Sequence, residues 1–95
     1  MIRMVAKEPG GLFRQVYGDD NLETYQHLVG GHFETVRIFT DIIMLVNDES
    51  RINGMPYNMD IWGHKIFGPA VFVGVDGEDF ADCPAGVEWF EEFFT

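Results

Sequence analysis

The sequence has few of the residues that would supply a disulfide or a catalytic nucleophile. Cys83 is its only cysteine, which excludes an internal disulfide and fits a reducing compartment. Asp82 and Pro84 flank this cysteine, and no base or cation stands beside it to favour the reactive thiolate. Ser50 is the only serine, and no Gly-x-Ser-x-Gly elbow surrounds it. We therefore expect no nucleophilic catalysis and no enzymatic activity.

Metal-binding and phosphate-binding patterns are missing as well. His27, His32 and His64 have no metal-ligand spacing with one another or with Cys83, so we expect surface or half-buried histidines. The acidic turn at residues 76–79 lacks the order of oxygen ligands found in a calcium loop. The Gly-Gly pair at residues 30–31 follows a predicted helix, whereas phosphate loops follow a strand and open a helix. We expect neither a metal nor a cofactor.

Basic residues are scarce. The chain has 6 Lys and Arg against 16 Asp and Glu, which gives a net charge of −10. Phosphate contacts need clustered cations, so direct binding to nucleic acid or to an anionic membrane is disfavoured. The negative charge serves solubility alone, or it suits a basic partner, including a protein whose normal ligand is nucleic acid.

Long hydrophobic runs are also absent. No run approaches the roughly 18–20 apolar residues that cross a membrane. The opening residues include Arg3 and Lys7, and the apolar stretch between them is too short for a signal peptide. We expect a soluble, cytoplasmic protein. Its 95 residues suffice for one domain, residues 1–95, with one core.

The apolar pattern that is present predicts an α+β domain: a small mixed, mostly antiparallel sheet of about five strands, with two helices packed on it. Strand patterns cover residues 1–6, 12–17, 32–39, 42–46 and 70–75. A two-residue turn at residues 40–41 makes the third and fourth strands a hairpin. The first helix starts at Asp20, with Glu23 completing a capping box, and ends at Gly30 and Gly31.

The second helix is C-terminal and is predicted to begin at Pro84, capped by Asp82 or Cys83. At about 100° per residue, one broad side of it is apolar and the other carries glutamates. The apolar residues are Val87, Trp89, Phe90, Phe93 and Phe94, and the glutamates are Glu88, Glu91 and Glu92. This arc is wider than one small sheet face requires. It either completes the core or also meets a second copy of the chain or a partner.

Residues 47–65 form a long polar connection, in which we expect one helical turn at residues 59–62. Polar side chains gather at its ends, namely Asn47, Asp48, Glu49, Arg51, Asn53, Tyr57 and Asn58. They either bond to the backbone of their own loop or form a polar pocket at the end of a central strand.

In the order and type of these residues, the sequence resembles the small phage and mobile-element proteins called domain of unknown function 3846. The likeness covers most of the chain and is carried by Leu28-Val29-Gly30-Gly31, Asn47-Asp48-Glu49, Gly54-Met55-Pro56-Tyr57-Asn58 and Ile66-Phe67-Gly68-Pro69. Ser50 stands where the family usually has glycine. The resemblance implies a small α+β domain from a phage or mobile element in a bacterial host. It supplies no catalytic residue.

Two functions follow as hypotheses. The first is a non-enzymatic accessory protein that binds and inhibits a host defence component in the host cytoplasm, as an acidic decoy for a protein that handles nucleic acid. The carboxylates assigned to this contact are Asp76, Glu78, Asp79 and Asp82.

The second hypothesis is a ligand-binding protein that sequesters a nucleotide-like immune signal, as a homo-oligomer through the C-terminal helix. Trp62 or Tyr57 would stack on a base, and Arg51 or Lys65 would pair with a phosphate. The candidate set is Asn47, Glu49, Arg51, Tyr57, Asn58, Trp62 and Lys65.

Overall fold

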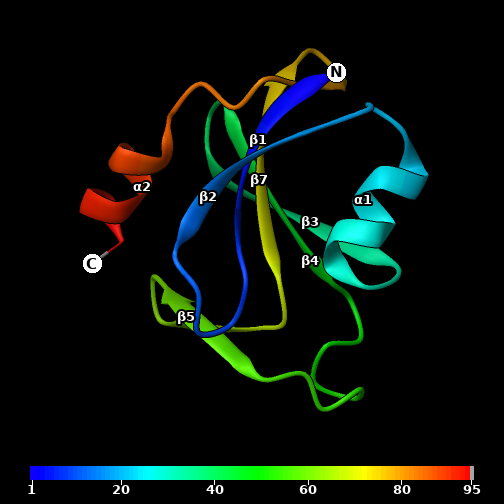
Figure 1. The fold of residues 1–95 in the computed structure, drawn as a ribbon, viewed down its shortest axis with the longest axis vertical. Helices are drawn as coiled ribbons and strands as arrows, with labels where there is room; N and C mark the ends of the chain where they lie inside the picture. Colours follow the sequence, from blue (N-terminus) through cyan, green and yellow to red (C-terminus); the bar gives the residue numbers. More distant parts are fainter. Residues whose placement is uncertain (95) are drawn as a thin grey trace.

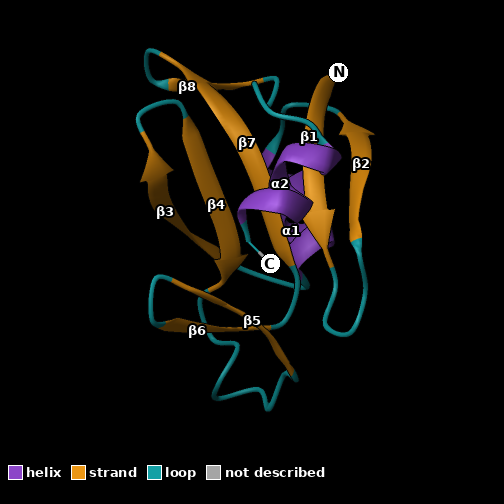
Figure 2. Ribbon diagram, turned by 90° about the vertical axis from the view of Figure 1, so that its left-hand side faces the viewer, coloured by secondary structure: helices purple, strands orange, loops and turns teal. Residues whose placement is uncertain are grey.

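The centre of the molecule is an antiparallel sheet with the strand order β2-β1-β7-β4-β3. The computed structural model describes residues 1–94; Thr95, the last residue of the predicted domain, lies outside them. Figure 2 shows the strands side by side, with the short β8 paired to the last residues of β7. Their bounds are β1 (Ile2–Lys7), β2 (Phe13–Gly18), β3 (Phe33–Phe39), β4 (Ile42–Asn47), β7 (Ala70–Asp76) and β8 (Asp79–Ala81). The five predicted strands are confirmed.

Both faces of this sheet are covered, because apolar side chains alternate between its two sides. Helix α1 (Leu22–Val29) packs on one face and helix α2 (Val87–Phe93) lies on the other, as Figure 1 shows. The run 42–46 and the run 70–75 fill the middle of the sheet, where one face of each strand meets α1 and the other meets α2. The predicted α+β class is confirmed, and every strand pairing within residues 1–94 is antiparallel.

The hairpin predicted at residues 40–41 is confirmed, since Phe39 pairs with Ile42 across a two-residue turn. The connection that follows β4 differs from its prediction. The helical turn expected at residues 59–62 is wrong, because these residues belong to a second hairpin of β5 (Tyr57–Ile61) and β6 (His64–Phe67). Met59 and Ile61 are buried against the same face as α2, which favours an extended backbone with alternating burial over a helix.

The cap of α1 also differs from the prediction. Asn21, not Asp20, is the N-cap, and its Oδ1 accepts a hydrogen bond of 2.9 Å from the Thr24 backbone N–H. Asp20 instead accepts a hydrogen bond from the Tyr25 hydroxyl. The predicted end is confirmed: Gly30 has φ 80°, and its N–H donates to the Gln26 carbonyl oxygen.

Helix α2 begins later than predicted. Its N-cap is Gly86, so neither Asp82 nor Cys83 caps it and Pro84 is not its first residue. The chain before it is tied to β1, because the Asp82 carboxylate accepts from the Arg3 N–H at 2.8 Å and the Cys83 N–H donates to the Arg3 carbonyl at 2.8 Å. These bonds hold the start of the segment 82–86, which connects β8 to α2 and which we name the strap, against β1. No helix in the described part of the chain is long and apolar enough to span a membrane.

Candidate functional site

Carboxylates gather at the tip of the β7–β8 hairpin. Asp76 pairs directly with Asp79 across the turn, and Glu78 lies in the turn itself. The hairpin meets the start of α1, where Glu78, Asp79 and Asp20 line one shallow hollow of about 290 Å³. No lysine or arginine lines this hollow. We name Asp20, Asp76, Glu78 and Asp79 the acidic tip.

Three of the four carboxylates predicted for partner binding therefore belong to one surface. Asp76, Glu78 and Asp79 are exposed and make no hydrogen bond or ion pair through their carboxylates within the described residues. Asp82 is also exposed, but its carboxylate holds the Arg3 backbone N–H. Sequence reasoning missed Asp20, which only the packing of α1 against the hairpin brings to this surface.

A second candidate site lies on the face of the sheet that carries the β5–β6 hairpin. Two adjoining hollows of about 330 and 440 Å³ share Glu34, Val46, Lys65 and Ile66, and together we name them the basic-rimmed groove. The floor of the larger hollow is aliphatic, formed by Val36, Ile38, Met44, Val46, Ile61 and Ile66. Trp62 and His64 stand at its edge. The groove therefore offers an apolar surface beside charged groups.

The cations of the chain are distributed unevenly around this groove. Of the six lysines and arginines, three are engaged elsewhere: Arg3 donates to the Cys83 carbonyl at 2.9 Å, Lys7 to Asn58 Oδ1 at 2.7 Å, and Arg14 pairs with Glu8 at 3.5 Å. The other three, Arg37, Arg51 and Lys65, line the groove. The Arg51 guanidinium lies 4.7 Å from the centre of the Phe67 ring, while the Arg37 guanidinium also donates to the Thr40 carbonyl.

The structure brings together four of the seven predicted ligand-binding residues in the smaller hollow and adds a fifth from the larger one. Asn47, Glu49, Arg51 and Lys65 line the first hollow, and Trp62 lines the second. Tyr57 and Asn58 line neither. Hydrogen bonding to the Asp60 carboxylate raises the pKa of Tyr57, so its hydroxyl stays protonated on the exposed edge of β5.

Asn47 and Asn58 are buried and are held by backbone groups. Asn47 Nδ2 donates to the Val29 carbonyl at 3.2 Å, and its Oδ1 accepts from the Glu49 N–H at 2.8 Å. Asn58 Nδ2 donates to the carbonyls of Lys7 and Gly68, each at 2.8 Å. Burial lowers the pKa of Lys7, whose ammonium donates to Asn58. Only the bond from Glu49 to Asn47 lies within the connection of residues 47–65. The amides of Asn47 and Asn58 bond to backbone outside it, and Asn47 also lines the smaller hollow, so neither of the two interpretations holds for both residues.

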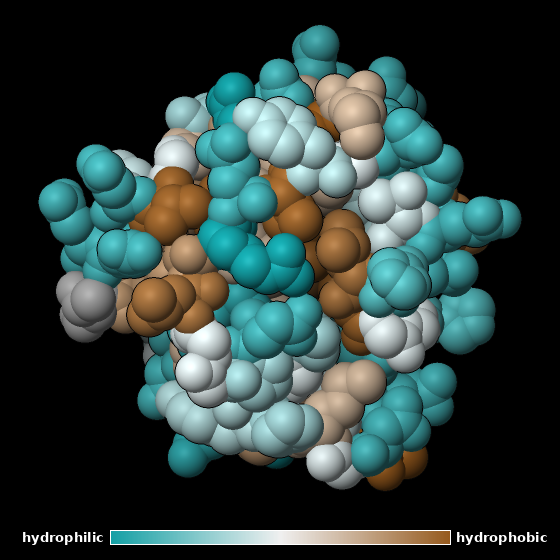
Figure 3. Space-filling model, in the orientation of Figure 1, coloured by the Kyte–Doolittle hydropathy of each residue, from teal (hydrophilic) through white to brown (hydrophobic). Residues whose placement is uncertain are grey.

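A third surface is aromatic and joins three elements that are distant in the sequence. Phe39 ends β3, Trp62 lies in the β5–β6 turn, and Trp89 and Phe93 belong to α2. The ring centre of Phe39 is 5.4 Å from that of Trp62, 5.4 Å from that of Trp89 and 5.2 Å from that of Phe93. Figure 3 shows hydrophobic residues exposed over α2 beside hydrophilic ones. We name these four residues the aromatic surface.

The aromatic surface explains the wide apolar arc predicted for the C-terminal helix. Phe90 is fully buried and Val87 and Phe94 are partly buried in the core, whereas Trp89 and Phe93 keep 37% and 46% of their surface exposed. One part of the arc therefore completes the core and another faces solvent. The sequence could not reveal that Phe39 and Trp62 meet them, because no spacing links these positions.

Within residues 1–94, no group of three or more His, Cys, Asp and Glu side chains is arranged to hold a metal ion. His27, His32 and His64 are all exposed. Cys83 is fully buried beneath α2, and this burial raises the pKa of its thiol.

Comparison with known proteins gives one family match. The family model described as Domain of unknown function (DUF3846) matches residues 2–95. No curated protein and no solved structure matches the chain.

Proposed function

Because the chain belongs to the family described as Domain of unknown function (DUF3846), which assigns no activity, we propose a function from the surfaces themselves. The chain is a non-enzymatic binding protein that occupies a basic surface on a host protein through its acidic tip. In this proposal it is an accessory protein of a phage or mobile element, and the host protein is a defence component that handles nucleic acid in the cytoplasm.

The observation that supports this proposal is the pairing of Asp76 with Asp79 at the hairpin end. Like charges directly opposite each other on neighbouring strands destabilise a hairpin. Glu78 between them and Asp20, which precedes α1, add further negative charge at the same place. Stability alone therefore does not account for this arrangement, whereas attraction to a basic surface does.

The size and shape of the tip suit such a contact. A two-residue turn projects the carboxylates from the rigid strand β7, which is buried over most of its length. Fixed charges on a rigid element lose little freedom on binding, and a net charge of −10 speeds the encounter with a basic protein. Carboxylates held in this way imitate the phosphates that the partner would otherwise bind.

The experiment that tests the proposal is capture from a bacterial lysate, with two charge variants beside the unaltered chain. The tip variant carries Asp76→Asn, Glu78→Gln and Asp79→Asn; the control carries Asp48→Asn, Glu49→Gln and Asp60→Asn, which remove the same charge elsewhere. We expect the unaltered chain and the control, but not the tip variant, to retain a basic protein that a salt step or added DNA releases. Equal capture by the two variants would overturn the proposal.

A second candidate function is favoured by the cations of the basic-rimmed groove. An anionic group would meet Lys65 and Arg51, which share the smaller hollow with Glu34, Asp48 and Glu49. A planar or apolar group would lie on the aliphatic floor beside Trp62. This arrangement supports sequestration of a nucleotide-like signal. A thermal-shift screen with nucleotides tests it: a stabilisation that Lys65→Gln abolishes and Arg14→Gln retains is expected, and no stabilisation by any nucleotide contradicts it.

A further inference from the structure

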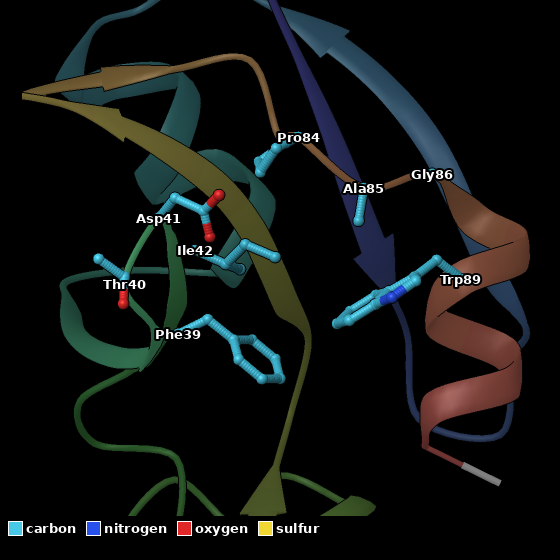
Figure 4. Close-up of a pocket in the computed structure, with 8 residues that line it drawn as sticks. All are labelled: Phe39, Thr40, Asp41, Ile42, Pro84, Ala85, Gly86 and Trp89. Carbon is cyan, nitrogen blue, oxygen red and sulfur yellow. The ribbon is translucent and has the colours of Figure 1, made fainter.

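A hollow between α2 and the β3–β4 turn combines aromatic rings with a carboxylate (Figure 4). It measures about 670 Å³, which is within the range of sites for small ligands and single side chains. It is lined by Phe39, Thr40, Asp41, Ile42, Pro84, Ala85, Gly86 and Trp89. In Figure 4 the rings of Phe39 and Trp89 approach each other, while the Asp41 carboxylate lies apart from them, with Ile42 between.

The two rings are held in place by their neighbours. Phe39 and Trp89 meet edge to face, with ring centres 5.4 Å apart and planes at 72°. Trp89 also stacks on Phe93, with ring centres 5.0 Å apart, and Trp62 meets Phe39 edge to face. These contacts restrict the rotamers of both rings, so the aromatic walls exist before any ligand arrives.

The charge of the hollow is negative. Asp41 is exposed, and its carboxylate has no hydrogen bond or ion pair with any residue in the range 1–94. No lysine or arginine lines the hollow. The guanidinium of Arg37, on the preceding strand, instead donates to the carbonyl of Thr40. A cation entering the hollow would therefore meet an uncompensated carboxylate and the rings of Phe39 and Trp89.

We propose that this hollow binds the guanidinium of an arginine side chain of a basic polypeptide. A guanidinium is planar, stacks on Trp and Phe faces, and forms paired hydrogen bonds with one carboxylate. An ammonium lacks the planar fork, and a phosphate or nucleotide would be repelled by Asp41. The choice of a basic polypeptide rests on the proposed function; the choice of arginine rests on the hollow.

The hollow and the acidic tip lie at the same end of the sheet. Ile42, which lines the hollow, pairs with Gly74 of β7, and Gly74 pairs in turn with Ala81 of β8. The strap of residues 82–86 leads from the acidic tip to the hollow. One basic segment could thus contact the carboxylates of the tip and insert an arginine beside Asp41.

A second copy of this chain is a poorer occupant on grounds of charge. A dimer across the aromatic surface would bring together two molecules of net charge −10. It would place each Asp41 and each set of exposed glutamates on α2 near their own counterparts, because a two-fold contact joins like surfaces. A basic segment neutralises the same carboxylates.

The test uses the intrinsic fluorescence of the protein. The chain has two tryptophans, so Trp62→Phe leaves Trp89 as the single indole reporter. This protein is titrated with a ten-residue peptide that contains three arginines. The control is the same peptide with each arginine replaced by citrulline, its neutral isostere. We expect a saturable change in Trp89 emission with the arginine peptide and binding at least about tenfold weaker with citrulline, since the charge-assisted hydrogen bonds are lost.

Two further variants in the same background complete the test. Asp41→Asn should weaken the arginine peptide by about tenfold, whereas Asp48→Asn, an exposed carboxylate outside the hollow, should leave its affinity unchanged. Equal binding of both peptides, an unaltered affinity in Asp41→Asn, or no saturable change overturns the inference. If the emission changes with protein concentration alone, a second copy of the chain occupies the hollow, and this result also overturns the inference.

The outcome is separable from that of the proposed function. The tip variant should keep the response of Trp89 to the arginine peptide while it loses the captured partner. If the protein captures a basic partner through its tip but the emission of Trp89 does not respond to the arginine peptide, only this inference is overturned. The reverse pattern overturns only the proposed function.

Discussion

Asn58 shows how a single polar residue holds distant parts of this small protein together. Its amide donates to carbonyls on β1 and on the turn before β7, and its oxygen accepts from the Lys7 ammonium. A buried amide that satisfies three groups fixes the β5–β6 hairpin against the end of the main sheet. The hairpin in turn forms one wall of the basic-rimmed groove.

We expect Asn58→Ala to lower the free energy of unfolding by about 2–4 kcal/mol, because it leaves two carbonyls without their donor and removes the side-chain acceptor of the Lys7 ammonium. Urea unfolding followed by circular dichroism measures the change. Asn53→Ala, at an exposed position in the same connection, should change stability by less than about 0.5 kcal/mol. Equal effects of the two substitutions would show that the hydrogen bonds of Asn58 do not hold the hairpin.

Cys83 gives a second prediction at the scale of the residue. Burial raises the pKa of its thiol above the ordinary value of 9.0. The folded chain therefore keeps the proton to higher pH, and the associated stability is present below about pH 9 and is lost as the pH rises through the folded value. A thiol-specific reagent at pH 8 should label the native protein at least about a hundredfold more slowly than the urea-unfolded protein, since thiolate and access are both lacking.

Fast labelling of native Cys83, approaching the rate in urea, would mean that α2 opens readily from the sheet. In that case Trp89, which belongs to α2, would not be a rigid wall of the hollow.

At the scale of the element, the β7–β8 hairpin is destabilised by the repulsion between its paired carboxylates, Asp76 and Asp79. Asp76→Asn relieves the repulsion with Asp79, and we expect it to raise the free energy of unfolding by about 0.2–1 kcal/mol at low salt. The gain should shrink in about 1 M salt, where the Debye length falls to about 3 Å. Chemical unfolding at the two salt concentrations checks both statements.

Asp48→Asn is the matched control, since Asp48 has no carboxylate directly opposite it on a neighbouring strand within the described residues. If Asp76→Asn proves destabilising at low salt, the carboxylate has a structural role, and the argument from repulsion fails.

The strands that could be predicted from the sequence are those with an uninterrupted run of apolar residues. Residues 42–46 and 70–75 are apolar throughout, and the structure places both in the middle of the sheet. The β5–β6 hairpin was missed because its turn is Trp62-Gly63, in which a tryptophan takes a φ of 49° where Asn or Gly is usual. The start of α2 was missed because Pro84 is compatible with a first helical position, while hydrogen bonds to Arg3 hold Asp82 and Cys83 against β1.

The candidate surfaces were predictable only where their residues are neighbours in the sequence. Asp76, Glu78 and Asp79 were identified from one acidic turn. Asp20 joins them through the packing of α1, and Phe39, Trp62 and Trp89 meet through contacts between three separate elements. Such contacts depend on strand order and register, which composition and spacing do not determine.

At the scale of the whole molecule, carboxylates lie at both ends of the sheet, whereas no lysine or arginine lines the hollow at the acidic tip. The unengaged carboxylates of the β7–β8 hairpin lie at one end of β7, whereas Arg51 and Lys65 belong to the connection at the other end of the sheet. A net charge of −10 spread evenly would serve solubility alone. At the acidic tip no cation lines the hollow, so its negative charge is uncompensated, and this favours the tip in an encounter with a basic partner.

The affinity of the captured partner, as a function of salt, tests the central claim most directly. The dissociation constant is measured for the unaltered chain, the tip variant and the control variant at 50 and 300 mM NaCl. We predict that the tip variant binds at least about tenfold more weakly than the control at 50 mM, and that this difference narrows at 300 mM because the attraction is screened. Equal affinities of the two variants at both salt concentrations would contradict the claim that the acidic tip is the binding surface.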